Sequence, residues 1–163
     1  MALSKRYTTA PKAGTIAAFL LVLIFGSPFY FDWVKDNISF DTAGGWWLHL
    51  LSTPRWAFAA DESVDSLVAA IVRDLFLIGL TALFLYLLPG SQLARARGTV
   101  SQFFAGWAAF IFAAAFATMI GYWFRNDPTL LKSFEDGMDG VAYGFFVGWI
   151  VGLAALGGRR GTR

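Results

Sequence analysis

The stretch LVAAIVRDLFLIGLTALFLYLLP, from Leu67 to Pro89, decides the fold class. Its only charged residues are the adjacent pair Arg73 and Asp74. A helix needs roughly 20 mostly apolar residues to cross a hydrocarbon core of about 30 Å. Within that core the backbone of a spanning segment must satisfy its own hydrogen bonds, which a helix does. We therefore predict a membrane-spanning helix over this stretch.

Three further apolar runs have a similar length, at Gly14–Trp33, Ser101–Phe124 and Asp139–Gly157. The whole chain is 57% hydrophobic and 15% charged, whereas soluble domains average about 45–50% apolar and about 25% charged residues. The sequence predicts an all-α, single-domain membrane protein over residues 1–163. We expect a four-transmembrane-helix bundle with external connections at about 34–66 and 125–138.

The first run resembles a signal peptide only in its basic start and apolar centre. GSPFY follows the run at residues 26–30, and this is a poor cleavage site because signal peptidase requires small residues. We expect an uncleaved first helix.

The distribution of basic residues predicts the orientation. Eight of them fall in the N-terminal arm, the second connection and the C-terminal tail: Lys5, Arg6, Lys12, Arg95, Arg97, Arg159, Arg160 and Arg163. No acidic residue lies in those segments. Because Lys and Arg accumulate on the cytoplasmic side, we expect both termini there, in a plasma (inner) membrane.

Composition also excludes several kinds of site. The chain has no cysteine and one histidine, His49, which argues against thiolate, iron–sulfur or multi-histidine metal centres. No acid pair or glycine-rich loop has the spacing of a known catalytic motif. We expect no enzyme, no cofactor and no metal, although a bound lipid is compatible with the sequence. The net charge of +2 is not a nucleic-acid footprint.

Small residues recur every four positions in the last two runs, which places them on one helix face each. They are Gly140, Gly144, Gly148 and Gly152 in the fourth run, and Ala105, Ala109, Ala113, Ala117 and Gly121 in the third. Such rows let helix backbones approach closely in membranes. The two runs are expected to pack as an antiparallel hairpin. One alternative is that one of the rows faces another subunit, and the glycine row is then the first candidate. The other alternative is a pore lined by the glycine ridges.

The first external connection contains GGWWLHLLSTPRW, at residues 44–56. On a helix, Trp46, Trp47, Leu50 and Leu51 share one side, and Pro54 ends the segment. This pattern is typical of an amphipathic helix in the membrane interface. The segment, with Trp56, is either an anchor on the outer leaflet or a docking surface for a partner.

Arg73 and Asp74 are the charges expected inside a span, a few positions below its outer boundary. Successive residues lie about 100° apart around a helix, so we expect each to find its partner elsewhere. Asp32, Arg125 and Asp139, at the outer ends of the other spans, are the candidates. Charges at this depth form structural ion pairs, bind a substrate, ion or proton, or contact a partner subunit.

These patterns favour a non-catalytic membrane subunit or scaffold that packs against a larger membrane complex or against itself. The alternative is a small transporter or channel component whose outer-leaflet site is Arg73 and Asp74. The expected partners are membrane lipids and another membrane subunit or a second copy.

Overall fold

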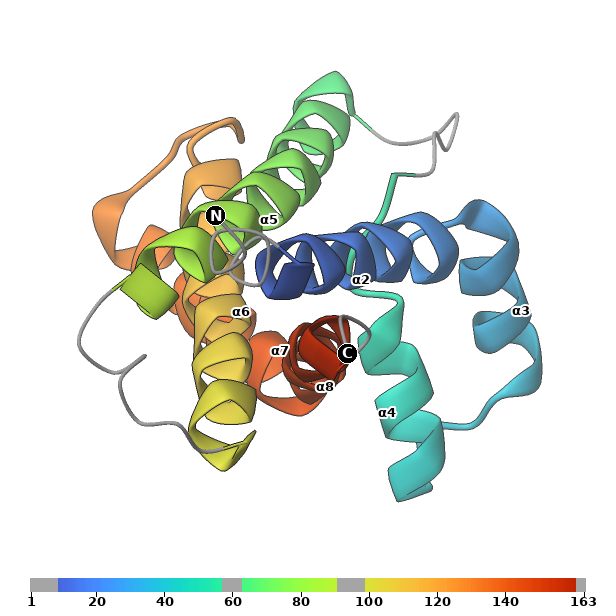
Figure 1. The fold of residues 1–163 in the computed structure, drawn as a ribbon. Coiled ribbons are helices and arrows are strands. Elements are labelled where there is room, and N and C mark those ends of the chain that lie inside the picture. The colour runs from blue at the N-terminus through green and yellow to red at the C-terminus, as the bar shows by residue number, and fades with distance from the viewer. Residues whose placement is uncertain (1–8, 57–62, 91–98, 161–163) are drawn as a thin grey trace.

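The computed structural model describes residues 9–56, 63–90 and 99–160, and the regular structure in these residues is entirely helical. The helices are shown in Figure 1 and run in the order α2 (Thr9–Phe25), α3 (Pro28–Asn37), α4 (Ala43–Leu51), α5 (Val64–Gly90), α6 (Thr99–Tyr122), α7 (Leu130–Val147) and α8 (Trp149–Arg160). The prediction of an all-α protein is therefore confirmed for the described residues.

Two of the helices are long and apolar enough to cross a membrane, α5 over Val64–Leu87 and α6 over Val100–Tyr122. They occupy the second and third predicted spans. At the start of α5 the Ser63 hydroxyl accepts a hydrogen bond from the Ser66 backbone N–H at 3.3 Å. This contact satisfies one of the donors that the first helical turn leaves without a partner.

The first predicted span is not one helix. α2 ends at Phe25, and α3 leaves at an angle of 60° to it. Ser27 caps α3 by accepting the Tyr30 N–H at 3.3 Å, and Pro28 occupies the first turn. A proline has no N–H to continue the preceding helix but suits the start of a new one. The prediction of a continuous helix from Gly14 to Trp33 is therefore wrong.

The fourth predicted span is also broken. α7 begins at Leu130 behind a Thr129 cap, and a bend of 52° at Gly148 separates α7 from α8. The predicted connection over 125–138 is correspondingly shorter, because helix already occupies its second half. The described residues therefore contain two candidate spans, or up to four if each bent pair crosses as one unit.

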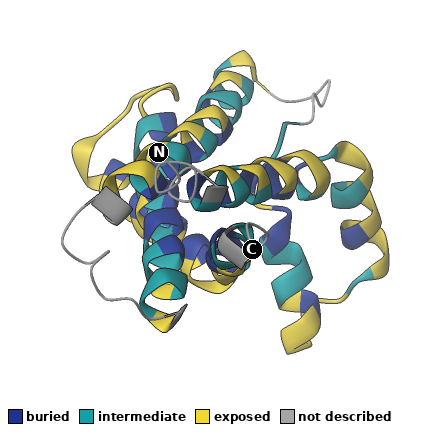
Figure 2. Ribbon diagram, in the orientation of Figure 1, coloured by how far each residue is buried: buried dark blue, intermediate teal, exposed yellow. Residues whose placement is uncertain are grey.

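α6 packs against three other helices, α5, α7 and α8, while α2 packs against α8 and α5. Figure 2 shows the buried residues gathered where these helices meet. Phe110 of α6, Val147 of α7 and Val151 of α8 are fully buried there, together with Leu77 of α5. α3 and α4 extend from this core and are joined by the Tyr30 hydroxyl, which donates to the Leu48 carbonyl at 3.1 Å.

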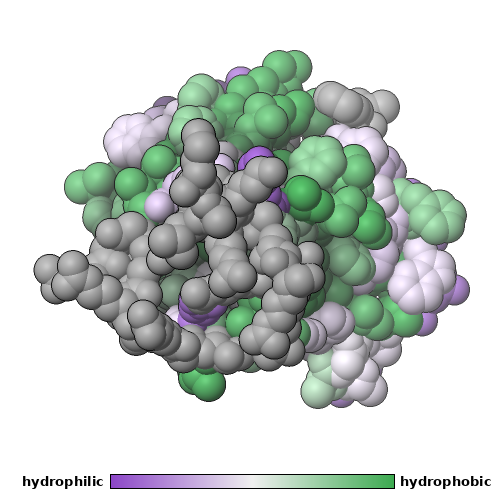
Figure 3. Space-filling view, in the orientation of Figure 1, coloured by the Kyte–Doolittle hydropathy of each residue, from purple (hydrophilic) through white to green (hydrophobic). Residues whose placement is uncertain are grey.

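Large apolar side chains cover much of the outer surface, as Figure 3 shows for one face. Ile16, Leu75, Phe112 and Leu153 are 58%, 64%, 55% and 49% exposed. Contiguous apolar surface of this kind is unusual for a monomer in water and suits contact with lipid. Apolar helices of sufficient length and this surface together indicate a membrane protein.

The predicted orientation depends on residues that are largely undescribed. Of the eight basic residues, Lys5, Arg6, Arg95, Arg97 and Arg163 lie outside the described residues. The orientation and the assignment of a single domain stay predictions.

Candidate functional site

The two charged residues within the apolar run of α5, Arg73 and Asp74, pair with each other. Arg73 Nε lies 3.0 Å from Asp74 Oδ1, and Arg73 Nη2 donates to the Thr53 carbonyl at 2.8 Å. The expectation that the two neighbours need separate partners is wrong. The Cβ atoms do point apart around the helix, but the arginine side chain is long enough to fold back beside the carboxylate.

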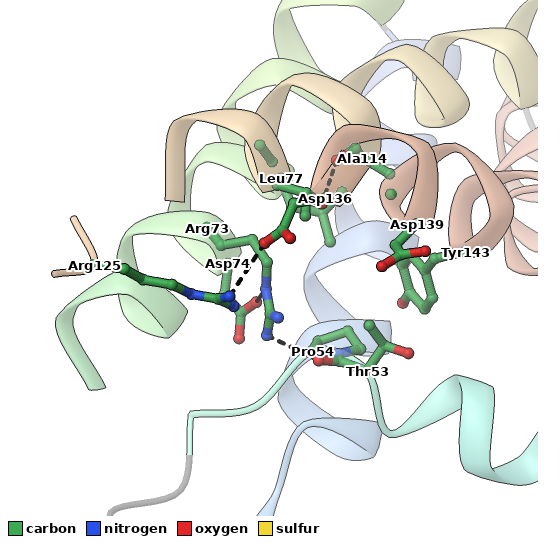
Figure 4. Close-up of a pocket in the computed structure, with 13 residues that line it drawn as sticks. Thr53, Pro54, Arg73, Asp74, Leu77, Ala114, Arg125, Asp136, Asp139 and Tyr143 are labelled. Atoms are coloured by element: carbon green, nitrogen blue, oxygen red, sulfur yellow. Dashed lines mark hydrogen bonds and ion pairs between the residues drawn. The ribbon is translucent and has the colours of Figure 1, made fainter. Parts of the chain in front are cut away.

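This ion pair lines a polar cavity of about 160 Å³ where α5, α6 and α7 meet the segment after α4. Figure 4 shows the side chains converging on it. Its lining residues are Thr53, Pro54, Arg73, Asp74, Leu77, Ala114, Ala117, Thr118, Arg125, Asp136, Asp139, Gly140 and Tyr143. The elements that supply them are adjacent because α6 packs against both α5 and α7.

Two buried oxygen atoms of the lining, Asp74 Oδ2 and Tyr143 Oη, make no hydrogen bond, although the Asp74 carboxylate also accepts a hydrogen bond from the Arg55 backbone N–H. Asp74 is 4% exposed and Tyr143 is 3% exposed, so bulk water does not reach them freely. Buried polar atoms are nearly always hydrogen-bonded, because desolvating one without a replacement bond costs roughly 1–3 kcal/mol. Two such atoms in one cavity point to an occupant that satisfies them.

A second ion pair stands at the rim of the cavity, with Arg125 Nη1 3.2 Å from Asp136 Oδ2. Asp139 lines the same cavity from the next turn of α7. Of the partners expected for the intramembrane charges, Arg125 and Asp139 therefore do lie at this site. Asp32 is exposed on α3 and does not line the cavity.

Asp136 and Tyr143 were not among the site residues predicted from the sequence. Asp136, Asp139 and Tyr143 are spaced i, i+3 and i+7, which places them on one face of α7. This spacing could have identified the three residues as one group. It was overlooked because Asp136 was assigned to a loop, whereas Asp139 and Tyr143 were assigned to the fourth predicted span.

The glycine row of α7 and α8 faces α6. A Cβ at Gly140 would lie 2.5 Å from the Ala114 carbonyl oxygen, and one at Gly144 would lie 2.7 Å from Ile111 Cα. A Cβ at Gly152 would lie 2.8 Å from the Phe103 carbonyl oxygen. These glycines are therefore covered by the chain itself.

The last residue of the alanine row of α6 contacts a different helix. Gly121, at the end of the row, lies against α5, where an added Cβ would be 2.8 Å from Arg73 Cβ and 2.9 Å from the Ala69 carbonyl oxygen. Ala109, Ala113 and Ala117 are fully buried, while Ala105 is partly exposed. The nearest neighbours of the glycine row are therefore Phe103, Ile111 and Ala114 of α6, which are not members of the alanine row.

The tryptophan-rich segment forms the helix α4, capped by Thr42, whose hydroxyl accepts the Gly45 N–H at 3.0 Å. Its apolar side packs onto the bend between α7 and α8. The Trp46 ring meets Phe146 edge-on at 4.8 Å, and the Trp47 indole donates to the Phe146 carbonyl at 3.2 Å. Leu51 is 1% exposed, and Leu50 is partly buried against the same core.

Trp56 makes similar contacts at the bend between α2 and α3. Its indole N–H lies 3.1 Å from the Val22 carbonyl and 3.2 Å from the Leu23 carbonyl, both at the end of α2. Its backbone N–H donates to the Gly26 carbonyl at 3.3 Å. The segment therefore binds the two broken helices together through both of its ends.

Within the described residues, no group of three histidine, aspartate or glutamate side chains is arranged to hold a metal ion. The chain matches no protein-family model, no curated protein and no solved structure in the comparisons made. The geometry of the cavity is therefore the basis for a functional assignment.

Proposed function

We propose that this chain is a non-catalytic integral membrane subunit whose polar cavity binds a small hydrogen-bonding ligand. The observation that carries the proposal is the pair of buried oxygen atoms without a hydrogen bond, Asp74 Oδ2 and Tyr143 Oη, in one cavity. In this proposal the bundle crosses the bilayer four times with cytoplasmic termini. The cavity then opens toward the outer leaflet, and the outer apolar surface contacts lipid and a partner subunit or a second copy.

The polar groups lie at one end of the bundle. This position favours the binding of a ligand over its passage through the protein. Farther along α5, Thr81 is fully buried, and its hydroxyl donates to the Leu77 carbonyl at 2.6 Å. Leu85 and Phe110 are buried in the same core. Within the described residues the lining of the cavity does not continue as a polar path across this core.

The second candidate is a transporter or channel component, and the two helix breaks favour it. Discontinuous membrane helices often expose carbonyl groups that bind ions near the bilayer centre. In this chain, indole groups donate to such carbonyls at Val22, Leu23, Phe145 and Phe146. Because those carbonyls already accept hydrogen bonds, they are less available to an ion. We therefore favour a ligand-binding subunit over a transporter.

The absence of cysteine allows a direct test of access to the cavity. Thr118 lines the cavity, whereas Thr81 is fully buried outside it, so Thr118→Cys and Thr81→Cys form a matched pair. We expect a membrane-impermeant thiol reagent, applied outside intact cells, to label Thr118→Cys at least tenfold faster. Equal rates would contradict an open binding cavity, and labelling of Thr118→Cys only from the inside would contradict the proposed orientation.

Purification in mild detergent, followed by mass spectrometry of everything that co-migrates, tests the subunit part of the proposal. A stoichiometric membrane partner or a stable homo-oligomer supports it. A lone monomer that carries an ion or solute across vesicle membranes, and loses that flux in Asp139→Asn, would replace it with the transporter candidate.

A further inference from the structure

The hydrogen-bonding groups that the cavity leaves available are mainly acceptors. Asp74 Oδ2 makes no hydrogen bond, and an ionised carboxylate can only accept. Tyr143 Oη both donates and accepts, and Asp139 adds a carboxylate at the rim. An occupant that satisfies them must donate several hydrogen bonds from a small volume.

The charges of the lining favour a cation. Asp74, Asp136 and Asp139 outnumber Arg73 and Arg125 by one. Both guanidinium groups are already bound by this chain, Arg73 by Asp74 and the Thr53 carbonyl, and Arg125 by Asp136. An anion entering the cavity would compete with these contacts and face the carboxylate of Asp139, whereas a cation faces a net negative lining.

The size of the cavity restricts the cation. A volume of about 160 Å³ is close to the roughly 150 Å³ of an engineered protein cavity that admits benzene, so it accepts a group of a few heavy atoms. A bare metal ion does not fit the donor set, because no three acidic or histidine side chains among the described residues converge on one point. A quaternary ammonium group has no N–H to donate to Asp74 and Tyr143.

We propose that the polar cavity binds a primary ammonium group, with Asp74, Tyr143 and Asp139 as its acceptors. A primary ammonium carries one positive charge and three N–H donors on one nitrogen. Its charge matches the excess negative charge of the lining, and its three N–H donors match the three acceptors in number. The inference rests on the proposed function, since it names the class of ligand for the same cavity.

The ammonium group has two natural sources with the same chemistry, the headgroup of an ethanolamine phospholipid and a small soluble amine. An apolar groove of about 210 Å³ between α2 and α5 favours the lipid, because Asp74 lines this groove as well as the polar cavity. The groove is lined mainly by Phe19, Leu23, Ile71, Leu75 and Ile78. An acyl chain would lie on these side chains while the headgroup reaches the carboxylate.

The test uses the full chain in a maltoside detergent that contains no amine. Thermal unfolding is followed while ethanolamine, choline or inorganic phosphate is added at equal ionic strength, and the shift of the midpoint yields an apparent Kd. We expect ethanolamine to bind at least tenfold more tightly than choline. Tyr143→Phe is expected to weaken ethanolamine binding about tenfold, because it removes one hydrogen bond to a charged group.

Two matched controls accompany this variant. Tyr86→Phe alters an exposed tyrosine on α5, and Asp36→Asn alters an exposed carboxylate on α3; both lie outside the cavity. We expect neither to change ethanolamine affinity, whereas Asp139→Asn should weaken it severalfold. Tyr143→Phe should also make the ligand-free protein slightly more stable, because it removes an unsatisfied buried hydroxyl. Opposite effects on stability and affinity separate a binding role from a structural one.

The source is resolved by native mass spectrometry of protein taken from nanodiscs that contain equal amounts of ethanolamine and choline phospholipids. One ethanolamine lipid retained per chain, and displaced by free ethanolamine, identifies the lipid. Binding of free ethanolamine without lipid retention identifies a soluble amine.

Equal shifts with ethanolamine and choline would overturn the proposal. Stabilisation by phosphate alone would also overturn it but would leave the cavity as a ligand site, so the proposed function would survive. If no probe shifts the midpoint and Thr118→Cys does not react, both proposals fail.

Discussion

The two helix breaks reach a similar bend by different means. Between α2 and α3 the bend of 60° follows the local sequence Gly26-Ser27-Pro28, with its serine cap and proline. Between α7 and α8 the bend of 52° occurs at Gly148, whose φ of −64° and ψ of −18° are helical. No proline lies there. The second break is stabilised by residues distant in the chain.

Tryptophans bind the carbonyls at the end of α7; Trp47 and Trp107 do so from distant parts of the chain, and Trp149 does so from the bend itself. Trp107 donates its indole N–H to the Phe145 carbonyl at 2.9 Å. Trp47 and Trp149 both donate to the Phe146 carbonyl, at 3.2 and 3.0 Å. A break can thus be encoded by the residues at the bend or by the residues that solvate its carbonyls. Only the first kind of break can be recognised from the sequence at the bend itself.

The largest expected effect is at the second break. Gly148→Leu would push a side chain against the Gly144 carbonyl oxygen and into Phe110 Cδ1 and Trp107 Cδ1, and the last two lie 2.9 and 3.0 Å from the position of an added Cβ. Overpacking of this kind costs about 1–3 kcal/mol or more. We expect a marked fall in the thermal unfolding midpoint in detergent.

Gly79→Leu is the matched control, since nothing lies within 4 Å of a Cβ added there. It should change the free energy of unfolding by less than about 0.5 kcal/mol, as exposed substitutions usually do. Equal midpoints for the two variants would show that contacts with α6 do not fix the bend.

An intermediate effect is expected when an indole donor is removed. Trp56→Phe leaves Leu23 without its indole hydrogen bond and should cost about 1–2 kcal/mol of unfolding free energy. Trp47→Phe should cost less, because Trp149 still donates to the Phe146 carbonyl. Urea or thermal unfolding of both variants in detergent measures the difference.

The double variant Trp47→Phe/Trp149→Phe sharpens this comparison. If the two indoles share one carbonyl, the double variant should cost more than the sum of the two single variants, because either indole alone can serve that carbonyl. Strict additivity would argue against a shared role.

The smallest effect is expected from Pro28→Ala. Ser27 still caps α3, and Trp56 still holds the Gly26 carbonyl, so the bend should persist with a loss of about 1 kcal/mol or less. The distance between spin labels on the exposed positions Ile16 and Asp36 reports the bend. A longer distance in Pro28→Ala would show that the proline alone interrupts the helix.

The comparison also explains how much of the fold could be predicted. Length and hydropathy identified α5 and α6, because a continuous apolar run depends on no other part of the chain. The sequence signal for the first break is Ser27-Pro28, but a prediction based on hydropathy alone does not take this signal into account. The second break could not be predicted, since its signal depends on which tryptophans reach Phe145 and Phe146.

The candidate site was predictable in part for the same reason. Arg73 and Asp74 stood out because charges are rare within an apolar run. Their pairing depends on the path of one flexible side chain, which sequence does not specify. Tyr143 stayed hidden because an aromatic residue in a membrane helix ordinarily needs no explanation, and only its burial without a hydrogen bond makes it informative.

The indole pair at the second break has an optical consequence. The rings of Trp47 and Trp149 are stacked, with centroids 6.4 Å apart and planes inclined by 26°. Transition dipoles at this separation couple, so the pair should give a split far-ultraviolet circular dichroism band that disappears when the rings separate. The band would report how α4 packs against the start of α8 in the unlabelled protein, so a ligand that moves either helix at this bend should change the band without any added probe.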